Sequence, residues 1–371
     1  MTHGLVLRGG SVFDPESGEF ADRDLRIVDG LFADGPAQPD DTIRDVTGLI
    51  VSPGLVDLHT HVFVGQDLGL DPTDIAAPSG TTVLVDTGSA GAHLFGAFRR
   101  STVERSATLI RAFLNVSSVG ATSIMLGGEL KAPYYVSEGA AVDAIEANRD
   151  LIVGVKVRAS ADVGGDNATG ALHAARRVAD RVGLPLMVHL GPAPAAVDEI
   201  ASVLGKGDIL THAFTGWPDN AIVRDGWLRD SVREARARGA LLDIGHGMSG
   251  FSANVARDML ALGELPDTIS TDLHAYSREL VVDFPTVLSK FLSFGMSLED
   301  VLVRATLAPS RAVGLDRGTI RVGAPADVAV LRRTPRDVEF TDGFGARWSG
   351  NELLECVMTV SGGEIVYGDA G

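Results

Sequence analysis

The chain has 371 residues, 45% of them hydrophobic, and a formal net charge of −17 at pH 7. This length and hydrophobic content exclude a disordered or fibrous chain and fit one large α/β domain with a smaller companion. The acidic charge argues against nucleic acid or an anionic membrane as a partner, because phosphate groups would be repelled over most of the surface.

The sequence also predicts where the protein resides. No apolar run approaches the roughly 18 residues that suggest a membrane-spanning helix, and residues 1–14 lack the basic and apolar regions of a secretion signal. Cys356 is the only cysteine, so the chain has no internal disulfide. A soluble, cytoplasmic protein is therefore the expectation.

Two kinds of pattern alternate along the chain. Residues 1–52 predict short strands separated by turns, as in "GLVLRGGSVFD" and "IRDVTGLIV". In residues 53–315, apolar strands alternate with amphipathic helices such as "GALHAARRVADRVG", which predicts successive βα units and a parallel sheet. Eight strand candidates occur there: "GLVDLHTH", "TTVLVDTG", "LIRAFLNVS", "LIVGVKVRA", "LPLMVHLG", "DILTHAFTG", "ALLDIGHG" and "TISTDLH".

Eight βα units over this span predict a (β/α)8 TIM barrel. Residues 316–371 return to strand patterns such as "GTIRVGAPADVAVLRR". We expect them to join residues 1–52 in a small β-sandwich beside the barrel, which itself covers residues 53–315. The sequence assigns no element to residues 333–351.

Histidines near strand ends suggest a metal site. His59 and His61 lie two apart in "GLVDLHTHVF", so the period of a strand aims both imidazoles at the same side. This spacing alone is weak evidence. Three later strand candidates end near His189, His212 and Asp272. Barrel enzymes gather catalytic groups from separate strands at the C-terminal edge, so these residues together predict a metal site there.

Lys156, one of four lysines, lies at the centre of "LIVGVKVRAS", which reads as a strand buried on both faces. Burying a charged ammonium costs on the order of several kcal/mol, so burial should lower the pKa of Lys156. The neutral amine is then available to add carbon dioxide. The resulting carbamate is an anionic oxygen donor able to bridge two divalent ions. The alternative is an ion pair with a carboxylate such as Asp162 or Asp166, but the neighbouring ligand candidates favour the carbamate.

With these residues placed, the chain resembles the amidohydrolase superfamily over nearly its whole length. The likeness rests on "PGLVDLHTH", the lysine and histidines on successive strands, the final aspartate, and "GAPADVAVL" near the end. It implies a centre of two divalent ions, usually zinc, although manganese, nickel or iron would fit the same nitrogen and oxygen ligands. It implies His59, His61 and Asp272 on one ion, His189 and His212 on the other, and carboxylated Lys156 bridging both.

Within the superfamily, "GVKVRAS", "LMVHLG" and "DIGHGMSGFS" look most like a group of deacetylases and dihydroorotase-like proteins. Activities in this group include hydrolysis of O-acetylated chiral 2-hydroxy acids. One departure concerns substrate contacts, because relatives often carry a glutamate where "HLGPAP" has Pro192.

The implied chemistry is attack of a metal-bridging hydroxide on a carbonyl carbon, with Asp272 taking its proton and returning it to the leaving atom. Arg158 shares the side of Lys156 and would grip a substrate carboxylate; the alternative is a salt bridge that holds the following loop. His246, on a glycine-flanked turn, is a candidate to contact substrate. His274, two beyond Asp272, is a candidate to contact substrate or to orient that aspartate.

The leading prediction is a binuclear metal-dependent hydrolase that cleaves an acyl ester or amide of a small carboxylate-bearing molecule. Suitable substrates are an O-acyl 2-hydroxy acid or an N-acyl amino acid. A cyclic amidase resembling dihydroorotase or hydantoinase is the first alternative and needs a pocket for a ring imide. A non-catalytic relative is less favoured, because such proteins typically lose metal ligands and all six positions are present here. The oligomeric state stays open, a homo-oligomer included.

Overall fold

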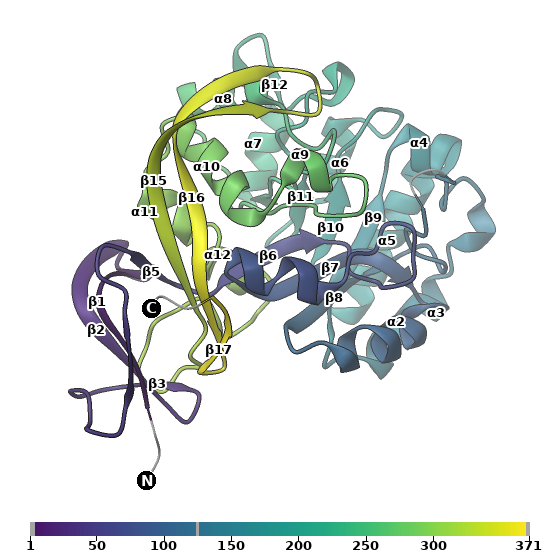
Figure 1. Cartoon of the computed structure of the whole chain (residues 1–371). Coiled ribbons are helices and arrows are strands. Elements are labelled where there is room, and N and C mark those ends of the chain that lie inside the picture. The colour runs from purple at the N-terminus through teal and green to yellow at the C-terminus, as the bar shows by residue number, and fades with distance from the viewer. Residues whose placement is uncertain (1–3, 124–125, 369–371) are drawn as a thin grey trace.

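The computed structural model describes residues 4–123 and 126–368, which form a barrel and a smaller sheet beside it (Figure 1). Seven parallel strands of the barrel pair in chain order. They are β6 (Leu55–Thr60), β7 (Thr81–Gly91), β8 (Leu109–Asn115), β9 (Ile152–Arg158), β10 (Leu186–His189), β11 (Ile209–Thr211) and β14 (Leu241–Leu242). This is the TIM-barrel architecture that the βα pattern predicts.

The eighth expected strand, "TISTDLH", is not a regular strand. It joins its neighbours through isolated parallel bridges, from Thr268 to Asp243 on one side and from Leu273 to Thr60 on the other. Backbone hydrogen bonds still run to both sides and close the ring. The interruption has a local cause, because Asp272 has a φ of 48°, outside the β region.

Helices surround the barrel (Figure 1). The longer ones are α2 (Phe95–Ser101), α3 (Glu138–Ala147), α5 (Ala168–Val182), α6 (Val197–Val203), α7 (Asp230–Ala237), α8 (Ala253–Ala261), α10 (Phe284–Ser293), α11 (Leu298–Val303) and α12 (Leu307–Ala312). Shorter helices are α1 (Pro72–Ile75), α4 (Ala161–Gly164) and α9 (Arg278–Val281). In α5, buried alanine, leucine and valine side chains recur at helical spacing, and Gly183 ends the helix in the left-handed conformation. Across the described ranges, no helix has both the length and the apolarity needed to span a membrane.

The two ends of the chain meet in one eight-stranded sheet. The N-terminal part supplies β1 (Leu5–Asp14), β2 (Glu19–Val28), β3 (Leu31–Ala33), β4 (Thr42–Asp45) and β5 (Ile50–Pro53), and the C-terminal part supplies β15 (Val328–Thr341), β16 (Arg347–Ser361) and β17 (Glu364–Tyr367). The junction is the antiparallel pairing of β5 with β15, where Val51 lies opposite Val330. Leu7, Ile27, Val330 and Met358 belong to a hydrophobic core that this sheet forms for itself.

The stretch 333–351, to which the sequence assigns no element, forms the outer half of the hairpin β15–β16. Figure 1 shows the hairpin, in olive and yellow, running from the small sheet past α10 towards α8. Hydrogen bonds fasten it to α10: Trp348 Nε1 donates to Ser293 Oγ at 2.9 Å, the Leu354 amide donates to Ser289 Oγ at 2.8 Å, and Lys290 Nζ donates to the Thr341 carbonyl at 3.1 Å. The small sheet therefore sends one long hairpin across the barrel.

Candidate metal centre

All six predicted ligands line one cavity of about 380 Å³. It lies at the C-terminal ends of the barrel strands, where β6 ends at Thr60 and β10 at His189. The ligand residues in its wall are His59, His61, Lys156, His189, His212 and Asp272. Residues from five different parts of the chain thus meet at the face of the barrel where such enzymes place their chemistry.

The donor atoms of these residues converge. Asp272 Oδ1 lies 3.4 Å from His59 Nε2 and 3.3 Å from His61 Nε2. Donor atoms of His59, His212 and Asp272 all lie within 4.8 Å of one another. The ring centroid of His189 lies 4.3 Å from that of His212, which places the two histidines side by side. Imidazoles and a carboxylate are the ligand set that zinc and similar divalent ions take.

Three of the predicted histidine ligands make a polar contact through Nδ1, which leaves the other ring nitrogen, Nε2, available to a metal. His59 Nδ1 lies 2.8 Å from Thr211 Oγ1, and His61 Nδ1 lies 2.8 Å from Ser89 Oγ. His212 Nδ1 lies 2.6 Å from the Gly245 carbonyl oxygen, which can only accept, so this nitrogen carries the proton. Such contacts fix the tautomer and leave Nε2 as the metal-binding atom.

The protonation states favour a metal as well. Burial lowers the pKa of His59 and His189 well below the usual value and that of His212 to about 4, so all three rings are neutral near pH 7. Neutral imidazole is the form that binds a metal. The residues present therefore fit a divalent metal centre.

Backbone strain marks the same site. His212 has a φ of 60° and Asp272 a φ of 48°, a region that non-glycine residues rarely adopt. Strain of this kind costs about 1–3 kcal/mol per residue and concentrates at functional sites. Gly247 touches this site directly, because a Cβ built on it would overlap Asp272 Oδ2. Any side chain at position 247 would therefore displace the Asp272 carboxylate.

We expect Gly247→Ala to lower kcat by about 10- to 100-fold, because a small displacement of Asp272 misplaces its carboxylate. Gly263→Ala is the matched control: Gly263 also has a positive φ, of 75°, but no atom lies within 4 Å of its would-be Cβ. Both variants place alanine at a positive φ, and only Gly247→Ala adds a clash with Asp272. Equal kcat values for Gly247→Ala and Gly263→Ala in steady-state assays would show that the clash with Asp272 does not affect catalysis.

A buried carboxylate supports His59 through a hydroxyl. Thr211 Oγ1 donates to Asp243 Oδ2 at 2.7 Å, so it accepts the proton of His59 Nδ1. Asp243 is fully buried and also accepts from Thr268 Oγ1 at 2.7 Å and from Ser270 Oγ at 2.8 Å. Burial raises the pKa of Asp243, and these hydroxyl donors oppose that shift. The sequence offered one unused signal for this residue, an acid inside the apolar run "ALLDIG".

Asp243→Asn should weaken metal binding by about 10- to 100-fold, the usual effect of removing a group that orients a metal-binding histidine. The amide cannot accept all three hydroxyl protons, so Thr211 loses its fixed orientation. Competition with a metal-binding dye measures the affinity, and the exposed Asp258→Asn serves as the control. Unchanged affinity in the folded variant would remove this supporting role.

Lys156 is 1% exposed, and burial lowers its pKa to about 7 against the opposing charge of nearby carboxylates. Its Nζ lies 3.4 Å from His59 Nε2 and 3.5 Å from Met187 Sδ. In the part of the chain that the structure describes, it forms no ion pair with Asp162 or Asp166. The lysine therefore faces the predicted ligands with an amine that is substantially neutral at physiological pH.

The predicted substrate-contacting residues divide into two groups. Arg158 and His274 line the cavity. The Tyr276 amide donates to His274 Nδ1 at 3.2 Å, so the proton of this ring is on Nε2. His274 Nε2 lies 4.0 Å from Asp272 Oδ2. His246 is fully buried and is not in the described cavity wall; its Nε2 lies 3.0 Å from Lys290 Nζ instead.

Arg158 lines the cavity, and its ion pair holds it to the loop after β8 and not to the loop after β9 that the sequence suggested. Its Nη1 lies 3.2 Å from Glu129 Oε1, in an ion pair with side-chain exposures of 11% and 4%. The same guanidinium lines the cavity. Glu129 was missed because it lies in the loop after β8, far from Arg158 in sequence. It anchors one edge of the guanidinium and leaves the group beside the predicted metal ligands.

The remaining wall of the cavity is mostly apolar, with Asp162 and Ser249 as its polar side chains. It includes Leu68, Pro192, Trp217, Met248 and Gly343. Gly343 comes from the tip of the hairpin β15–β16, whose place at this site could not be predicted from the sequence.

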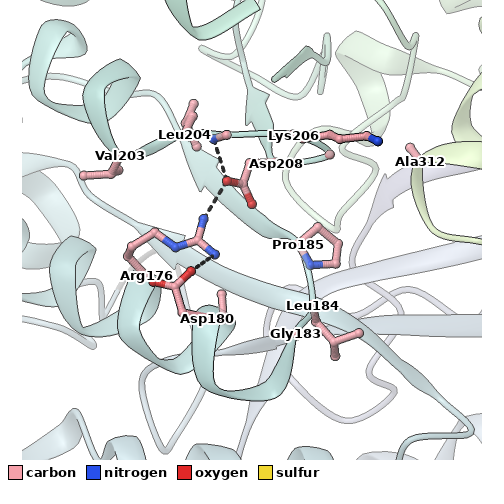
Figure 2. Close-up of a pocket in the computed structure, with 13 residues that line it drawn as sticks. Arg176, Asp180, Gly183, Leu184, Pro185, Val203, Leu204, Lys206, Asp208 and Ala312 are labelled. Carbon is pink, nitrogen blue, oxygen red and sulfur yellow. Dashed lines mark hydrogen bonds and ion pairs between the residues drawn. The ribbon is translucent and has the colours of Figure 1, made fainter. Parts of the chain in front are cut away.

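A larger cavity of about 590 Å³ lies at the opposite end of the barrel, before the first residues of β10 and β11 (Figure 2). There, Arg176 pairs with Asp208 at 2.5 Å and with Asp180 at 2.7 Å. Polar groups at this end of a TIM barrel typically serve stability rather than chemistry. The smaller cavity, which holds the predicted ligands, is therefore the candidate active site.

Comparison with known proteins agrees with this geometry. The amidohydrolase family matches residues 50–366. A deacetylase from Agrobacterium fabrum is 37% identical over 332 residues, covering 88% of this chain and 82% of its own, and a deacetylase from Enterococcus faecalis is 30% identical, covering 98% and 99%. The crystal structure of a dihydroorotase superimposes with a TM-score of 0.92 at 34% identity, covering 99% of this chain and 98% of its own. The chain therefore belongs to the amidohydrolase family and is a metal-dependent hydrolase.

Proposed function

We propose that the protein removes an acyl group, as an ester or amide, from a small molecule that carries a carboxylate. The observation that carries this proposal is the guanidinium of Arg158 in the wall of the cavity that holds the predicted metal ligands. Arginine pairs with carboxylates through two parallel hydrogen bonds, which would fix the substrate's direction. The two deacetylase relatives support the same reaction class.

The predicted ligands would divide between two ions, as the resemblance implies. His59, His61 and Asp272 would hold one ion, His189 and His212 the other, and a carbamate on Lys156 both. Bound divalent ions, with zinc as the expected metal, lower the pKa of water and polarise a carbonyl oxygen.

The remaining steps belong to the chain's own residues. Burial alone would raise the pKa of Asp272, but the neighbouring histidines, His59 foremost, hold it well below the usual range. Asp272 is therefore ionised and can accept a proton from the attacking water. It then returns that proton to the leaving oxygen or nitrogen. His274 Nε2 lies 4.0 Å from Oδ2, beyond direct hydrogen-bond distance, so its N–H dipole would help to orient the carboxylate during both transfers.

The proposal is tested by assaying the metal-loaded enzyme on a matched panel, with a chelator control for each substrate. The panel contains O-acetyl-(R)- and (S)-2-hydroxy acids, N-acetyl-D- and L-amino acids, dihydroorotate and a hydantoin. We expect chelator-sensitive hydrolysis of one acyclic enantiomer. Turnover of the ring substrates alone would favour a cyclic amidase, the second candidate, which the likeness to the dihydroorotase structure supports.

Carboxylation of Lys156 should depend on pH. With a pKa of about 7, the lysine is mostly ammonium below this pH and mostly neutral amine above it, and only the amine adds carbon dioxide. We therefore expect the apoprotein to take up metal in bicarbonate buffer more slowly as the pH falls through about 7. Uptake is followed by metal analysis after desalting, with and without bicarbonate. A bicarbonate-independent rate at every pH would contradict the carbamate.

A further inference from the structure

The tip of the hairpin β15–β16 reaches the candidate active site, although the other end of the hairpin belongs to the small sheet. Gly343 lines the cavity, and a Cβ built on it would overlap the carbonyl oxygen of Met248, another wall residue. Phe344 packs edge to face against Trp217, with ring centroids 5.7 Å apart. Two successive residues of the tip therefore contact the loops that wall the cavity.

Asp342 anchors this tip to the barrel. It is 3% exposed, and its Oδ2 accepts from the Ala253 amide, at the first residue of α8, at 2.8 Å. Its Oδ1 accepts from the amides of Phe344 and Ala346, each at 2.9 Å. One buried carboxylate thus fixes the shape of the turn and its position on the barrel.

Lys290 of α10 anchors the tip from the other side. It is 2% exposed, and its Nζ lies 3.0 Å from His246 Nε2, 3.1 Å from the Leu280 carbonyl and 3.1 Å from the Thr341 carbonyl. An ammonium has three donors, so all three are used. Thr341 precedes the tip and His246 precedes the loop that contains Met248, so this lysine ties two parts of the cavity wall to one helix.

The exposed apolar surface points to what this wall binds. Met248, which is 45% exposed, and Trp217 line the cavity, and Phe344, which is 39% exposed, packs against Trp217 without lining the cavity itself. Arg158 and the predicted metal ligands account for the carboxylate and the reacting carbonyl of the proposed substrate, which leaves its third group for the apolar wall. Apolar walls with few polar groups are how small-molecule sites bind such a substituent.

We propose that Gly343, Trp217 and Met248 form the subsite that selects the apolar substituent of the substrate, and that Phe344, Lys290 and Asp342 are positioning residues for this subsite. The inference rests on the proposed function for the orientation of the substrate. It assigns specificity to a hairpin that contains none of the predicted metal ligands.

The first test compares pairs of substrates that differ only in a methyl or benzyl group. The pairs are O-acetyl-lactate with O-acetyl-3-phenyllactate, N-acetylalanine with N-acetylphenylalanine, and 5-methyl- with 5-benzylhydantoin. For whichever pair is hydrolysed, we expect the wild type to prefer the benzyl member and Phe344→Ala to reduce that kcat/KM ratio by about tenfold or more. Arg347→Ala, on the same hairpin with a side chain 74% exposed, should keep the ratio. A Phe344→Ala ratio within about twofold of the wild type would overturn the proposal.

A binding measurement separates this inference from the proposed function. Calorimetry of propanoate and 3-phenylpropanoate with the metal-loaded protein requires no turnover. A preference for the phenyl compound that is lost in Phe344→Ala supports the subsite even if no acyl compound is hydrolysed. A wild type without that preference overturns the subsite even if acyl hydrolysis is found.

The positioning role is tested with Lys290→Met, and with Asp342→Asn should the first variant fail to fold. Each keeps Phe344, so we expect the benzyl preference to fall as in Phe344→Ala while metal content is retained. We also expect trypsin to cleave faster at Arg347, because the tip is released. Lys206→Met, at an exposed lysine in the cavity of Figure 2, is the matched control. Unchanged preference and unchanged cleavage in a folded variant would overturn this role.

Discussion

Asp272→Asn is expected to remove nearly all hydrolysis while much of the bound metal remains. The amide oxygen of asparagine can still act as a ligand for the ion that His59 and His61 would hold. Their Nε2 atoms lie 3.4 and 3.3 Å from Asp272 Oδ1. Asparagine cannot accept a proton at neutral pH, so transfer from the attacking water to the leaving group fails. Loss of general acid and base catalysis should lower kcat by about 10³-fold.

The measurement needs kcat and metal content from the same preparation, because a loss of metal alone would also stop turnover. Asp258→Asn, at an exposed position of α8, controls for the change in charge. The metal-loaded Asp272 variant should keep its KM within a few-fold if the residue acts on the proton rather than on binding. Full activity in that variant would show that another group carries the proton.

Arg158→Met should lower kcat/KM by about 100-fold or more on substrates that carry a carboxylate. Methionine keeps much of the apolar stem but removes the charged hydrogen bonds, which leaves a substrate carboxylate buried without a partner. The same change also leaves Glu129 unpaired, at 3.2 Å from the lost Nη1. The loss must therefore be divided between substrate and protein.

A cycle of two enzymes and two substrates makes that division. Wild type and Arg158→Met are each assayed on an acetylated 2-hydroxy acid and on its neutral methyl amide. A carboxylate clamp predicts a large loss on the acid and little change on the amide. Equal losses on both would instead identify Arg158 as a support for the loop that contains Glu129. The double variant Arg158→Met with Glu129→Gln then shows how much of the loss comes from the unpaired acid.

Much of the barrel could be predicted from local pattern. The spacing of His59 and His61 and the position of Lys156 within an apolar run depend only on the period of a strand. Parallel strands bring their C-terminal ends to one face, so placement of His189 and His212 follows from topology. The eighth predicted strand is irregular for a physical reason. Asp272 has a positive φ, which its surroundings impose and its local sequence does not predict.

The supporting residues could not be predicted in this way. Asp57 accepts a hydrogen bond from Thr271, 214 positions away, and Asp342 accepts one from Ala253, 89 positions away. Nothing in the local sequence of either aspartate specifies such a partner. The position of the hairpin tip at the cavity could not be predicted from local sequence either, because it depends on how the small sheet packs against the barrel.

The pairing of β5 with β15 has a consequence for the order in which the enzyme is made. A ribosome releases the N-terminal strands and every predicted metal ligand before the hairpin emerges, and domains generally fold as units during synthesis. Until then, β5 lacks its C-terminal neighbour and the cavity lacks Gly343 from its wall. A nascent chain can thus assemble its ligands before it acquires this part of the wall, so the final stretch of translation determines when the pocket is complete.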